Sequence, residues 1–191
     1  MLELVDIHKE FDGKKVLDGI SLSVAAGECV CLTGASGCGK TTLLRIAAGL
    51  ETADSGVRNI NAKTKIAVLF QEDRLLPWDT ALSNITAVGV DADRARYFLK
   101  RVGLENEADS YPDELSGGMK RRLSLARMLA YGGDLYLFDE ALTGLDEALQ
   151  KDMLDLIKEE ICGKAAIIVS HNPTVPQYLG ARPARLGSTS Q

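Results

Sequence analysis

One glycine-rich stretch constrains this chain more than any other part of its sequence. Residues 34–42 read GASGCGKTT and fit the pattern G-x-x-x-x-G-K-[ST]. The residues at its fixed positions are Gly34, Gly39, Lys40 and Thr41. An apolar run at 29–33 precedes the stretch, and a helix-like run at 42–48 follows it. A strand, a glycine turn and a helix in this order direct backbone N–H groups and the positive end of a helix to one point. The sequence therefore predicts a phosphate-binding loop.

The bulk properties are those of an ordinary globular protein. The 191 residues are 46% hydrophobic and 26% charged, which suits one domain with a substantial core. No apolar run approaches the roughly 18 residues that a membrane span needs. Glu3 and Asp6 interrupt the first apolar residues, which argues against a signal peptide. The net charge of −5 argues against nucleic acid as a partner. We expect a cytoplasmic protein that does any membrane work through a partner.

Hydrophobic patterns along the chain are alternately strand-like and helix-like. Short apolar or alternating runs predict strands at 2–7, 16–24, 29–33, 57–60, 65–70, 135–138 and 165–169. Helical spacing and capping residues predict helices from Asp79 to about Val88, from Asp91 to Gly103, from 117 to 129 and from 147 to 161. Together these predict an α/β fold with a parallel sheet, an antiparallel N-terminal β part and a helical insertion at about 72–131.

Two acids follow one of the predicted strands. Asp139 and Glu140 come directly after the apolar run 135–138. An acid at the carboxyl end of a strand lies beside the phosphate loop in an open α/β sheet. We expect Asp139 to hold Mg²⁺, directly or through water, and Glu140 to act as general base or to orient the attacking water. The alternative is that both acids lie on a surface loop.

A second glycine turn identifies a family. Residues 115–119 read LSGGM and precede the helix predicted from residue 117, so that their N–H groups form another anion site. Together with the other motifs, this turn resembles the ATP-binding cassette (ABC) family, whose signature motif is LSGGQ, and the resemblance runs from Leu2 to about Asn172. In that family the motif of one subunit completes the ATP site of the other. The resemblance implies a P-loop NTPase core, ATP and Mg²⁺ as ligands, and a head-to-tail homodimer with ATP.

The resemblance also assigns roles to single residues. Gln71 matches the family's glutamine loop, where the amide oxygen ligates Mg²⁺ and positions water. His171 matches the switch histidine that contacts the γ-phosphate, and Asp146 matches the D-loop that contacts the partner's phosphate loop. Phe11 stands where an aromatic side chain stacks on adenine. A core residue at a turn is the alternative for Phe11.

Three groups of site residues follow. Those expected to bind the nucleotide within one subunit are Phe11, Gly34, Ala35, Ser36, Gly37, Cys38, Gly39, Lys40, Thr41 and Thr42. Those expected to take part in catalysis are Gln71, Glu140 and His171, and those expected to ligate Mg²⁺ are Thr41, Gln71 and Asp139. Those expected to reach the partner's nucleotide are Leu115, Ser116, Gly117, Gly118, Met119 and Asp146.

The segment after Gln71 indicates a class of transporter. Residues 71–78 read QEDRLLPW, and LLPW in this place is similar to the importer ATPases for nitrate, sulfonates, taurine and thiamine precursors. In those importers the loop receives a helix of the integral membrane permease, and a solute-binding protein takes part indirectly. The resemblance implies a cytoplasmic subunit that lies peripherally on the inner face of the cell membrane, with Trp78 as an interface anchor. A core tryptophan is the alternative.

The chain departs from the family pattern at three places. Met119 replaces the glutamine near the ribose of the opposed nucleotide, and we expect a modest loss of affinity. The chain ends 20 residues after His171, so we expect a single domain, 1–191, without a C-terminal regulatory domain. Pro173 and Pro176 are expected to prevent a helix from starting after the histidine. The tail from Gly180 is expected to be loose at its end.

Two other functions compete with an importer ATPase. A cassette ATPase without transport usually brings a second cassette, a long coiled-coil insert or a basic face, and this chain shows none of them. A small nucleotide kinase would suit the chain length but needs an arginine-rich lid. It has no use for the LSGG turn or for a glutamate directly after the Mg²⁺ aspartate. The sequence therefore favours the importer ATPase.

Overall fold

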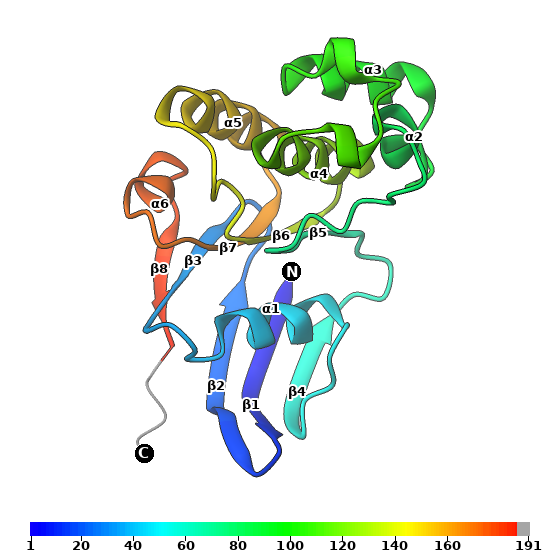
Figure 1. Cartoon of the computed structure of the whole chain (residues 1–191). Coiled ribbons are helices and arrows are strands. Elements are labelled where there is room, and N and C mark those ends of the chain that lie inside the picture. The colour runs from blue at the N-terminus through cyan, green and yellow to red at the C-terminus, as the bar shows by residue number, and fades with distance from the viewer. Residues whose placement is uncertain (187–191) are drawn as a thin grey trace.

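A computed structural model describes residues 1–186 and contains two sheets (Figure 1). The larger sheet has five parallel strands in the order β5-β6-β7-β3-β8. Its strands are β5 (Ile66–Leu69), β6 (Leu135–Asp139), β7 (Ala165–Val169), β3 (Cys29–Thr33) and β8 (Arg182–Arg185). All five strands run the same way, so their carboxyl ends meet at one edge, where ligands bind in open α/β sheets.

The smaller sheet is antiparallel and comes from the N-terminal part of the chain, as predicted. Its strands, in spatial order, are β2 (Lys14–Val24), β1 (Leu2–Phe11) and β4 (Ser55–Ile60). The alternation in the sequence places Leu17, Leu22 and Val24 inward, and all three are buried. One face of this sheet therefore packs on the core, and the other face is left to solvent.

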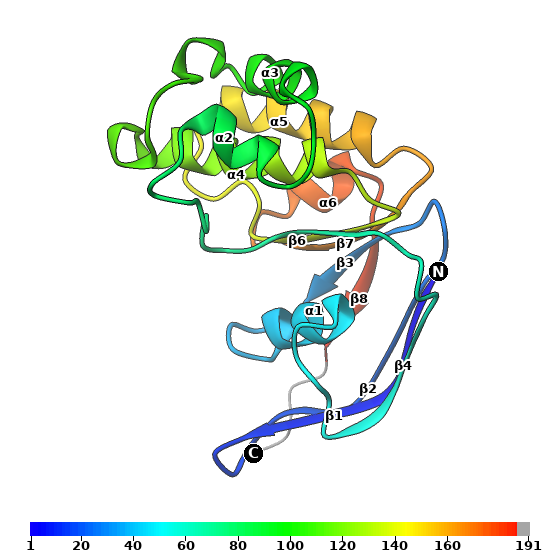
Figure 2. The same cartoon turned by 90° about the vertical axis from the view of Figure 1, so that its right-hand side faces the viewer.

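Helix α1 (Lys40–Ala48) lies between the two sheets (Figure 2). Leu43, Leu44 and Ile46 of this helix pack in one core cluster with Leu4 of β1 and Leu137 of β6. The phosphate loop ends where α1 begins, so this packing fixes the loop against both sheets.

The other face of the parallel sheet is covered by helices. These are α2 (Ala81–Thr86), α3 (Ala92–Arg101), α4 (Gly117–Tyr131), α5 (Glu147–Glu160) and the short α6 (Thr174–Tyr178), with 3-10 turns at Glu105–Glu107 and Pro112–Glu114. Tyr136 and Phe138 of β6 pack against this helical layer, whereas Leu135 and Leu137 of the same strand pack toward α1. Both faces of β6 are therefore buried, which explains its uninterrupted apolar sequence.

The N-terminal caps of two helices in the insertion can be compared with the predicted caps. Asp91 caps α3, because its carboxylate accepts a hydrogen bond from the Arg94 N–H at 2.8 Å. The predicted stripe on α3 is also confirmed: Ala95, Phe98, Leu99 and Val102 are all buried. The prediction that Asp79 caps the preceding helix is wrong. Thr80 is the cap, with its hydroxyl accepting from the Ser83 N–H at 3.2 Å, so α2 begins at residue 81.

The segment after residue 171 differs from the prediction. A short helix, α6, begins directly after Pro173, although the two prolines were expected to prevent one. The first N–H groups of a helix make no bonds within it, so Pro176 in the first turn costs no hydrogen bond. Strand β8 then pairs with β3, which the sequence did not indicate. The end of the predicted loose tail, 187–191, lies outside the described residues.

Within residues 1–186, none of the helices has both the length and the apolar character to cross a membrane.

Candidate functional site

A cavity of about 370 Å³ lies at the carboxyl ends of strands β6 and β7 and at the start of α1. Its lining residues are Val16, Ser36, Gly37, Gly39, Lys40, Thr41, Thr42, Gln71, Asp139, Glu140, Thr143, Val169 and His171. Ten of the predicted site residues thus converge here from four separate segments of the sequence. Gly34, Ala35 and Cys38 belong to the same loop but are not among these lining residues.

The glycines of the phosphate loop are required by its backbone. Gly39 has φ of +94° and precedes the first residue of α1. A Cβ atom there would lie 2.7 Å from Leu17 Cδ2 and 2.8 Å from the carbonyl oxygen of Val16. Gly34 has φ of +152°, and a Cβ atom there would lie 2.7 Å from Cys38 Sγ. Strand β2 therefore packs so closely on the loop that a larger residue would open it.

Lys40 is held within the loop by backbone oxygens. Its side chain is buried, and Nζ donates to the carbonyl oxygens of Gly34 and Ala35, each at 2.9 Å. These contacts keep a positive charge at the start of α1, where the helix adds its own positive end. This arrangement of loop, helix and ammonium suits the predicted phosphate-binding loop.

Asp139, the last residue of β6, is only 4% exposed. Burial raises the pKa of its carboxyl above the usual range, while the Thr41 hydroxyl and the Arg45 guanidinium partly oppose that rise. Thr41 and Gln71 line the same cavity. In residues 1–186, no group of three or more His, Cys, Asp or Glu side chains is arranged to hold a metal ion by itself. The hydroxyl, amide and carboxylate oxygens here suit Mg²⁺ that is also bound by phosphate oxygens.

Glu140 has an unusual backbone and a confined carboxylate. Its φ of +54° lies in the left-handed region, which few residues other than glycine adopt. The carboxylate is 13% exposed, with Oε1 3.2 Å from Nε2 of His171 and Oε2 within 3.4 Å of the Thr143 hydroxyl. Oε1 makes no aligned hydrogen bond to any group in the described chain. A buried carboxylate oxygen with spare capacity can accept a proton or a hydrogen bond from a water.

The LSGG turn lies away from the cavity. Ser116 caps α4, with its hydroxyl accepting from the Met119 N–H at 3.3 Å, and both Ser116 and Gly117 are exposed. Among the residues described, none from 115–119 lines the cavity. The LSGG turn is therefore separate from the cavity within one chain, and its role as an anion site stays a prediction.

Asp146 and Phe11 lie outside the cavity lining as well. Asp146 is exposed and caps α5 by accepting from the Leu149 N–H at 2.9 Å. Phe11, at the end of β1, is 43% exposed, so the alternative of a core residue is wrong. Lys9 Nζ lies 5.0 Å from the centre of its ring. The adenine-stacking role of Phe11 stays a prediction.

Three lining residues were missed by the sequence analysis. Thr143 follows Glu140 by three residues, and Val169 ends the strand before His171, so their positions in the chain were a usable signal. Val16 comes from β2 and reaches the cavity only because that strand packs on the phosphate loop. No local pattern marks it.

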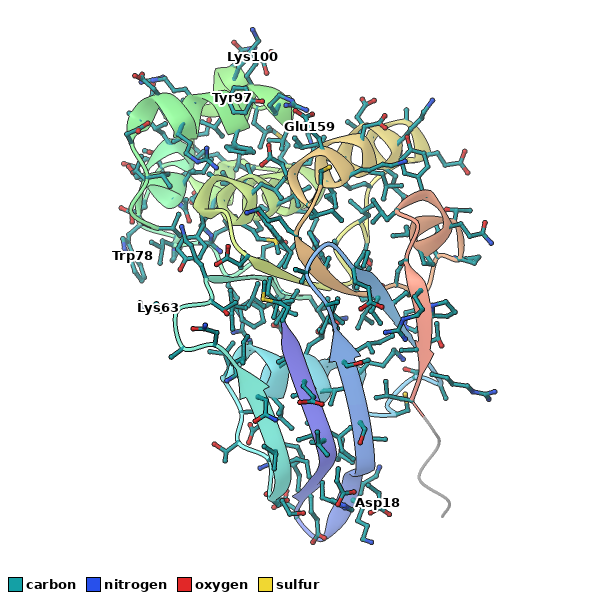
Figure 3. The ribbon with its side chains drawn as sticks, turned by 180° about the vertical axis from the view of Figure 1, so that it is seen from behind. Asp18, Lys63, Trp78, Tyr97, Lys100 and Glu159 are labelled. Atoms are coloured by element: carbon teal, nitrogen blue, oxygen red, sulfur yellow. The ribbon has the colours of Figure 1, made fainter. Side chains whose placement is uncertain are left out.

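Trp78 is 71% exposed, so the alternative of a core tryptophan is wrong (Figure 3). The loop that carries it is held by Asn84, which is fully buried in α2. The Asn84 Oδ1 accepts from the Leu76 N–H at 2.8 Å, and Nδ2 donates to the carbonyls of Leu76, Asp79 and Thr80 at 3.0–3.1 Å. A fixed loop thus presents a large aromatic side chain to solvent.

The fold and the cavity define a P-loop nucleoside triphosphatase with a second glycine turn at the start of helix α4. A model of the ABC transporter family matches residues 17–143, and the chain belongs to that family. It is an ATP-binding cassette of the kind that hydrolyses ATP, which excludes the nucleotide kinase considered above.

Curated relatives share about two fifths of their residues with this chain. It is 41% identical to the aliphatic sulfonates import ATP-binding protein SsuB 2 of Agrobacterium fabrum, a match covering 95% of this chain and 74% of the relative. It is 41% identical to SsuB of Cupriavidus pinatubonensis, with coverage of 90% and 60%, and 39% identical to SsuB 1 of Shouchella clausii, with coverage of 90% and 71%. The chain thus spans 60–74% of the length of these three relatives.

Solved structures resemble the whole fold. The dimeric structure of MJ0796, a bacterial ABC transporter cassette, superposes with a TM-score of 0.90 at 28% identity and covers 97% of this chain and 94% of that chain. A dimeric post-hydrolysis state of the same cassette, bound to ADP and Pi, gives 0.88 at 27% identity, with coverage of 98% and 95%.

Proposed function

We propose that this chain is the ATP-hydrolysing subunit of a membrane importer and that it works as a head-to-tail pair. The observation that carries the proposal is the convergence of Lys40, Gln71, Asp139, Glu140 and His171 on one cavity, while the LSGG turn lies elsewhere. Two chains arranged head to tail would place Ser116–Gly118 of each against the nucleotide in the other. The dimeric cassettes that share this fold support such a pair.

Each residue then has a defined task in the pair. Lys40 and the N–H groups of residues 34–42 bind the β- and γ-phosphates, and Thr41, Gln71 and Asp139 hold Mg²⁺. The metal ion supplies charge neutralisation at the phosphate oxygens. Glu140 accepts the proton of the attacking water or orients it, and His171, 3.2 Å from that carboxylate, reaches toward the γ-phosphate.

The partner chain supplies the remaining contacts. Ser116 and the N–H groups at the start of α4 face the opposite nucleotide, with Met119 beside them. The Leu115 side chain is 4% exposed and packs in the core of its own subunit, so it anchors the turn and does not reach the partner's nucleotide. Asp146 contacts the partner's phosphate loop, and Phe11 stacks on adenine within its own subunit. The exposure of Ser116, Asp146 and Phe11 in the single chain supports these roles, because a side chain that meets a partner or a ligand must be accessible.

The membrane permease binds on the loop that carries Trp78. Trp78 and Leu50 are large apolar side chains that are 71% and 60% exposed. A cavity of about 300 Å³ lies between β5 and α4, lined in part by Leu50, Phe70 and Met128. An exposed apolar side chain at such a cavity and an exposed tryptophan both suit contact with a helix of a partner protein. The permease holds the chain at the cytoplasmic face of the membrane, and a solute-binding protein takes part through the permease.

The proposed class of transporter is inferred from the relatives of this chain. The proteins named above are import ATPases for aliphatic sulfonates, and the LLPW segment favours the same group of importers. A cassette ATPase without transport is the competing function, and the exposed side chain of Trp78 favours a permease partner over it.

Light scattering of the Glu140→Gln variant, with and without Mg-ATP, tests the proposal. This variant should bind Mg-ATP and hydrolyse it about 10²–10⁴-fold more slowly, as loss of a positioned base does. We expect a monomer alone and a dimer with Mg-ATP. A variant that binds Mg-ATP and stays monomeric at every protein concentration would refute the head-to-tail pair. Wild-type turnover by the variant would refute Glu140 as the base.

A further inference from the structure

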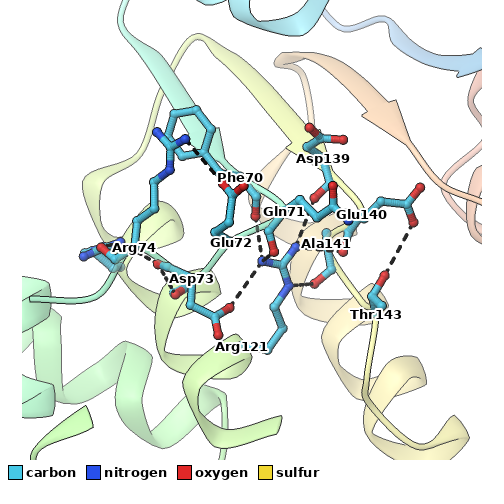
Figure 4. A network of polar contacts seen from close by, with 12 residues as sticks. Phe70, Gln71, Glu72, Asp73, Arg74, Arg121, Asp139, Glu140, Ala141 and Thr143 are labelled. Carbon is cyan, nitrogen blue, oxygen red and sulfur yellow. Dashed lines mark hydrogen bonds and ion pairs between the residues drawn. The ribbon is translucent and has the colours of Figure 1, made fainter. Parts of the chain in front are cut away.

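The guanidinium of Arg121 joins two walls of the nucleotide cavity. Arg121 lies on α4, five residues after Ser116, and is only 5% exposed. Its donors reach the carbonyl oxygens of Phe70 (2.6 Å), Gln71 (3.2 Å), Asp139 (3.0 Å), Glu140 (2.7 Å) and Ala141 (2.8 Å), and the carboxylate of Asp73 (3.4 Å). Figure 4 shows this side chain between the two loops.

One wall is the bend that follows β6. Three consecutive carbonyls, those of residues 139–141, turn toward a single guanidinium. Adjacent carbonyls of an extended strand point in opposite directions, so the chain must bend to bring all three together. The bend occurs at Glu140, whose φ is +54°. Such a backbone persists only where its surroundings hold it, and Arg121 provides three of the bonds that do so.

The other wall is the segment that contains Gln71. Arg121 binds the carbonyls of Phe70 and Gln71, where β5 has just ended. The Gln71 side chain is thereby left free to line the cavity, as the Glu140 side chain does on the opposite wall. A planar group with five donors in a fixed fork can set the distance between two such loops.

We propose that Arg121 is a positioning residue for ATP hydrolysis, which fixes Glu140 and Gln71 relative to one another across the cavity. It touches neither nucleotide nor water in this role, and acts through the backbone of the two loops. The inference rests on the proposed hydrolytic function of this cavity. It adds a residue that joins the helix of the LSGG turn to the groups that handle the attacking water.

The energetic cost of burying a guanidinium favours a positioning role for Arg121 over a role in which its side chain only fills space in the core. Burial lowers the pKa of the Arg121 guanidinium, and Asp73 is the main group that opposes the drop. A buried cation is retained where it satisfies groups that no apolar side chain could satisfy. Five carbonyl oxygens around one side chain are such groups, and a lysine ammonium has only three donors for them.

Arg122 offers a matched control on the same helix. Its guanidinium donates to the carbonyls of Val102 (2.5 Å) and Gly103 (3.1 Å), at the end of α3 and away from the cavity. Arg122→Lys therefore disturbs a partly buried arginine of α4 without touching either wall.

The test compares steady-state ATP hydrolysis, binding of a fluorescent ATP analogue and thermal unfolding in four chains. These are wild type, Arg121→Lys, Arg121→Gln and Arg122→Lys. We expect Arg121→Lys to lower kcat by up to about 10²-fold, which is the effect of displacing catalytic groups by about 1 Å. The Kd of the analogue should stay within about twofold of the wild-type value, because Arg121 does not contact the nucleotide and its replacement should be nearly independent of binding. Arg122→Lys should keep the wild-type kcat. Arg121→Gln serves the same comparison if the lysine variant does not fold.

A double-mutant cycle with Glu140→Gln separates positioning from simple destabilisation. If Arg121 acts through Glu140, Arg121→Lys should cost little further activity once Glu140 is replaced, in single-turnover hydrolysis. An equal fold-loss in both backgrounds would overturn the inference, as would a folded Arg121→Lys chain with wild-type kcat. A wild-type chain that binds but never hydrolyses ATP would instead overturn the proposed function.

Discussion

Replacing Asn84 with alanine should destabilise the protein and release the loop that carries Trp78. Two of the backbone groups that Asn84 binds have a second partner. The Leu76 carbonyl also accepts from the Asp79 N–H at 3.2 Å, and the Thr80 carbonyl accepts from the backbone N–H of residue 84 at 2.8 Å. The Leu76 N–H and the Asp79 carbonyl depend on the amide side chain. The variant therefore leaves two backbone groups without their partners.

The size of the effect follows from these two groups. Each buried polar group left without a partner costs about 1–3 kcal/mol. Leu76 and Asp79 are only half-buried, so we take the lower part of that range and expect a loss of about 3 kcal/mol in total. For a chain of this size the loss corresponds to a drop of about 6–12 °C in Tm.

The assay has a global and a local part. Urea unfolding followed by far-UV circular dichroism gives the free energy of unfolding. Fluorescence anisotropy of Trp78, the single tryptophan of the chain, reports the mobility of its loop. Thr86→Ala is the control, because it removes only a bond to the Ser83 carbonyl on the same helix and should change stability by less than about 0.5 kcal/mol. A loss below about 1 kcal/mol with unchanged Trp78 anisotropy would refute the reasoning about two orphaned groups.

Three further outcomes are expected. Lys40→Ala should abolish binding of a fluorescent ATP analogue, and tight binding by this variant would contradict the phosphate loop. Ser116→Asp should leave the free energy of unfolding unchanged, because aspartate caps α4 as well as serine does. It should abolish cooperative ATP hydrolysis, because it places a negative charge at the phosphates of the partner's nucleotide. Retained cooperativity would contradict the shared site. Asp139→Asn should unfold at a higher Tm than wild type at neutral pH without nucleotide, because burial raises the pKa of Asp139 in the folded chain and disfavours its charged form. As pH falls through the folded pKa and then the unfolded one, the wild-type carboxyl becomes neutral, so the difference in Tm should shrink; a difference that grows toward low pH would contradict it.

Much of the site could be predicted from the sequence, because the local backbone conformation at these positions permits only certain residue types. Gly34 and Gly39 adopt positive φ, and a Cβ atom at either position would lie too close to a neighbouring atom. Both positions therefore require glycine, which makes the motif recognisable in the sequence. Asp139 and Glu140 follow a strand buried on both faces, and such a strand reads as an unbroken apolar run. The antiparallel and parallel sheets, and the capped helix α3, follow from equally local patterns.

The errors arose where distant parts of the chain decide the outcome. Asp79 and Thr80 are both good capping residues, and α2 begins after Thr80, where the N–H groups of residues 81 and 82 donate to the distant carbonyl oxygens of residues 110 and 108. Strand β8, from a proline-containing segment, forms because β3 offers it a free edge. The surface position of Trp78 could not be read from its neighbours in sequence, since Leu75 and Leu76 beside it are partly buried.

The sequence by itself determined the family, the phosphate loop, the acids and the segments that carry them, because each depends on a few residues at fixed spacing. Only the tertiary structure decided which of these groups face one another. It brought Glu140 to 3.2 Å from His171, left the LSGG turn outside the cavity lining, and placed Arg121 between two loops 50 and 18 residues away in the chain. The reason is physical: a hydrogen bond between a guanidinium and a distant carbonyl leaves no periodic trace in the sequence, and exists only once the core has packed.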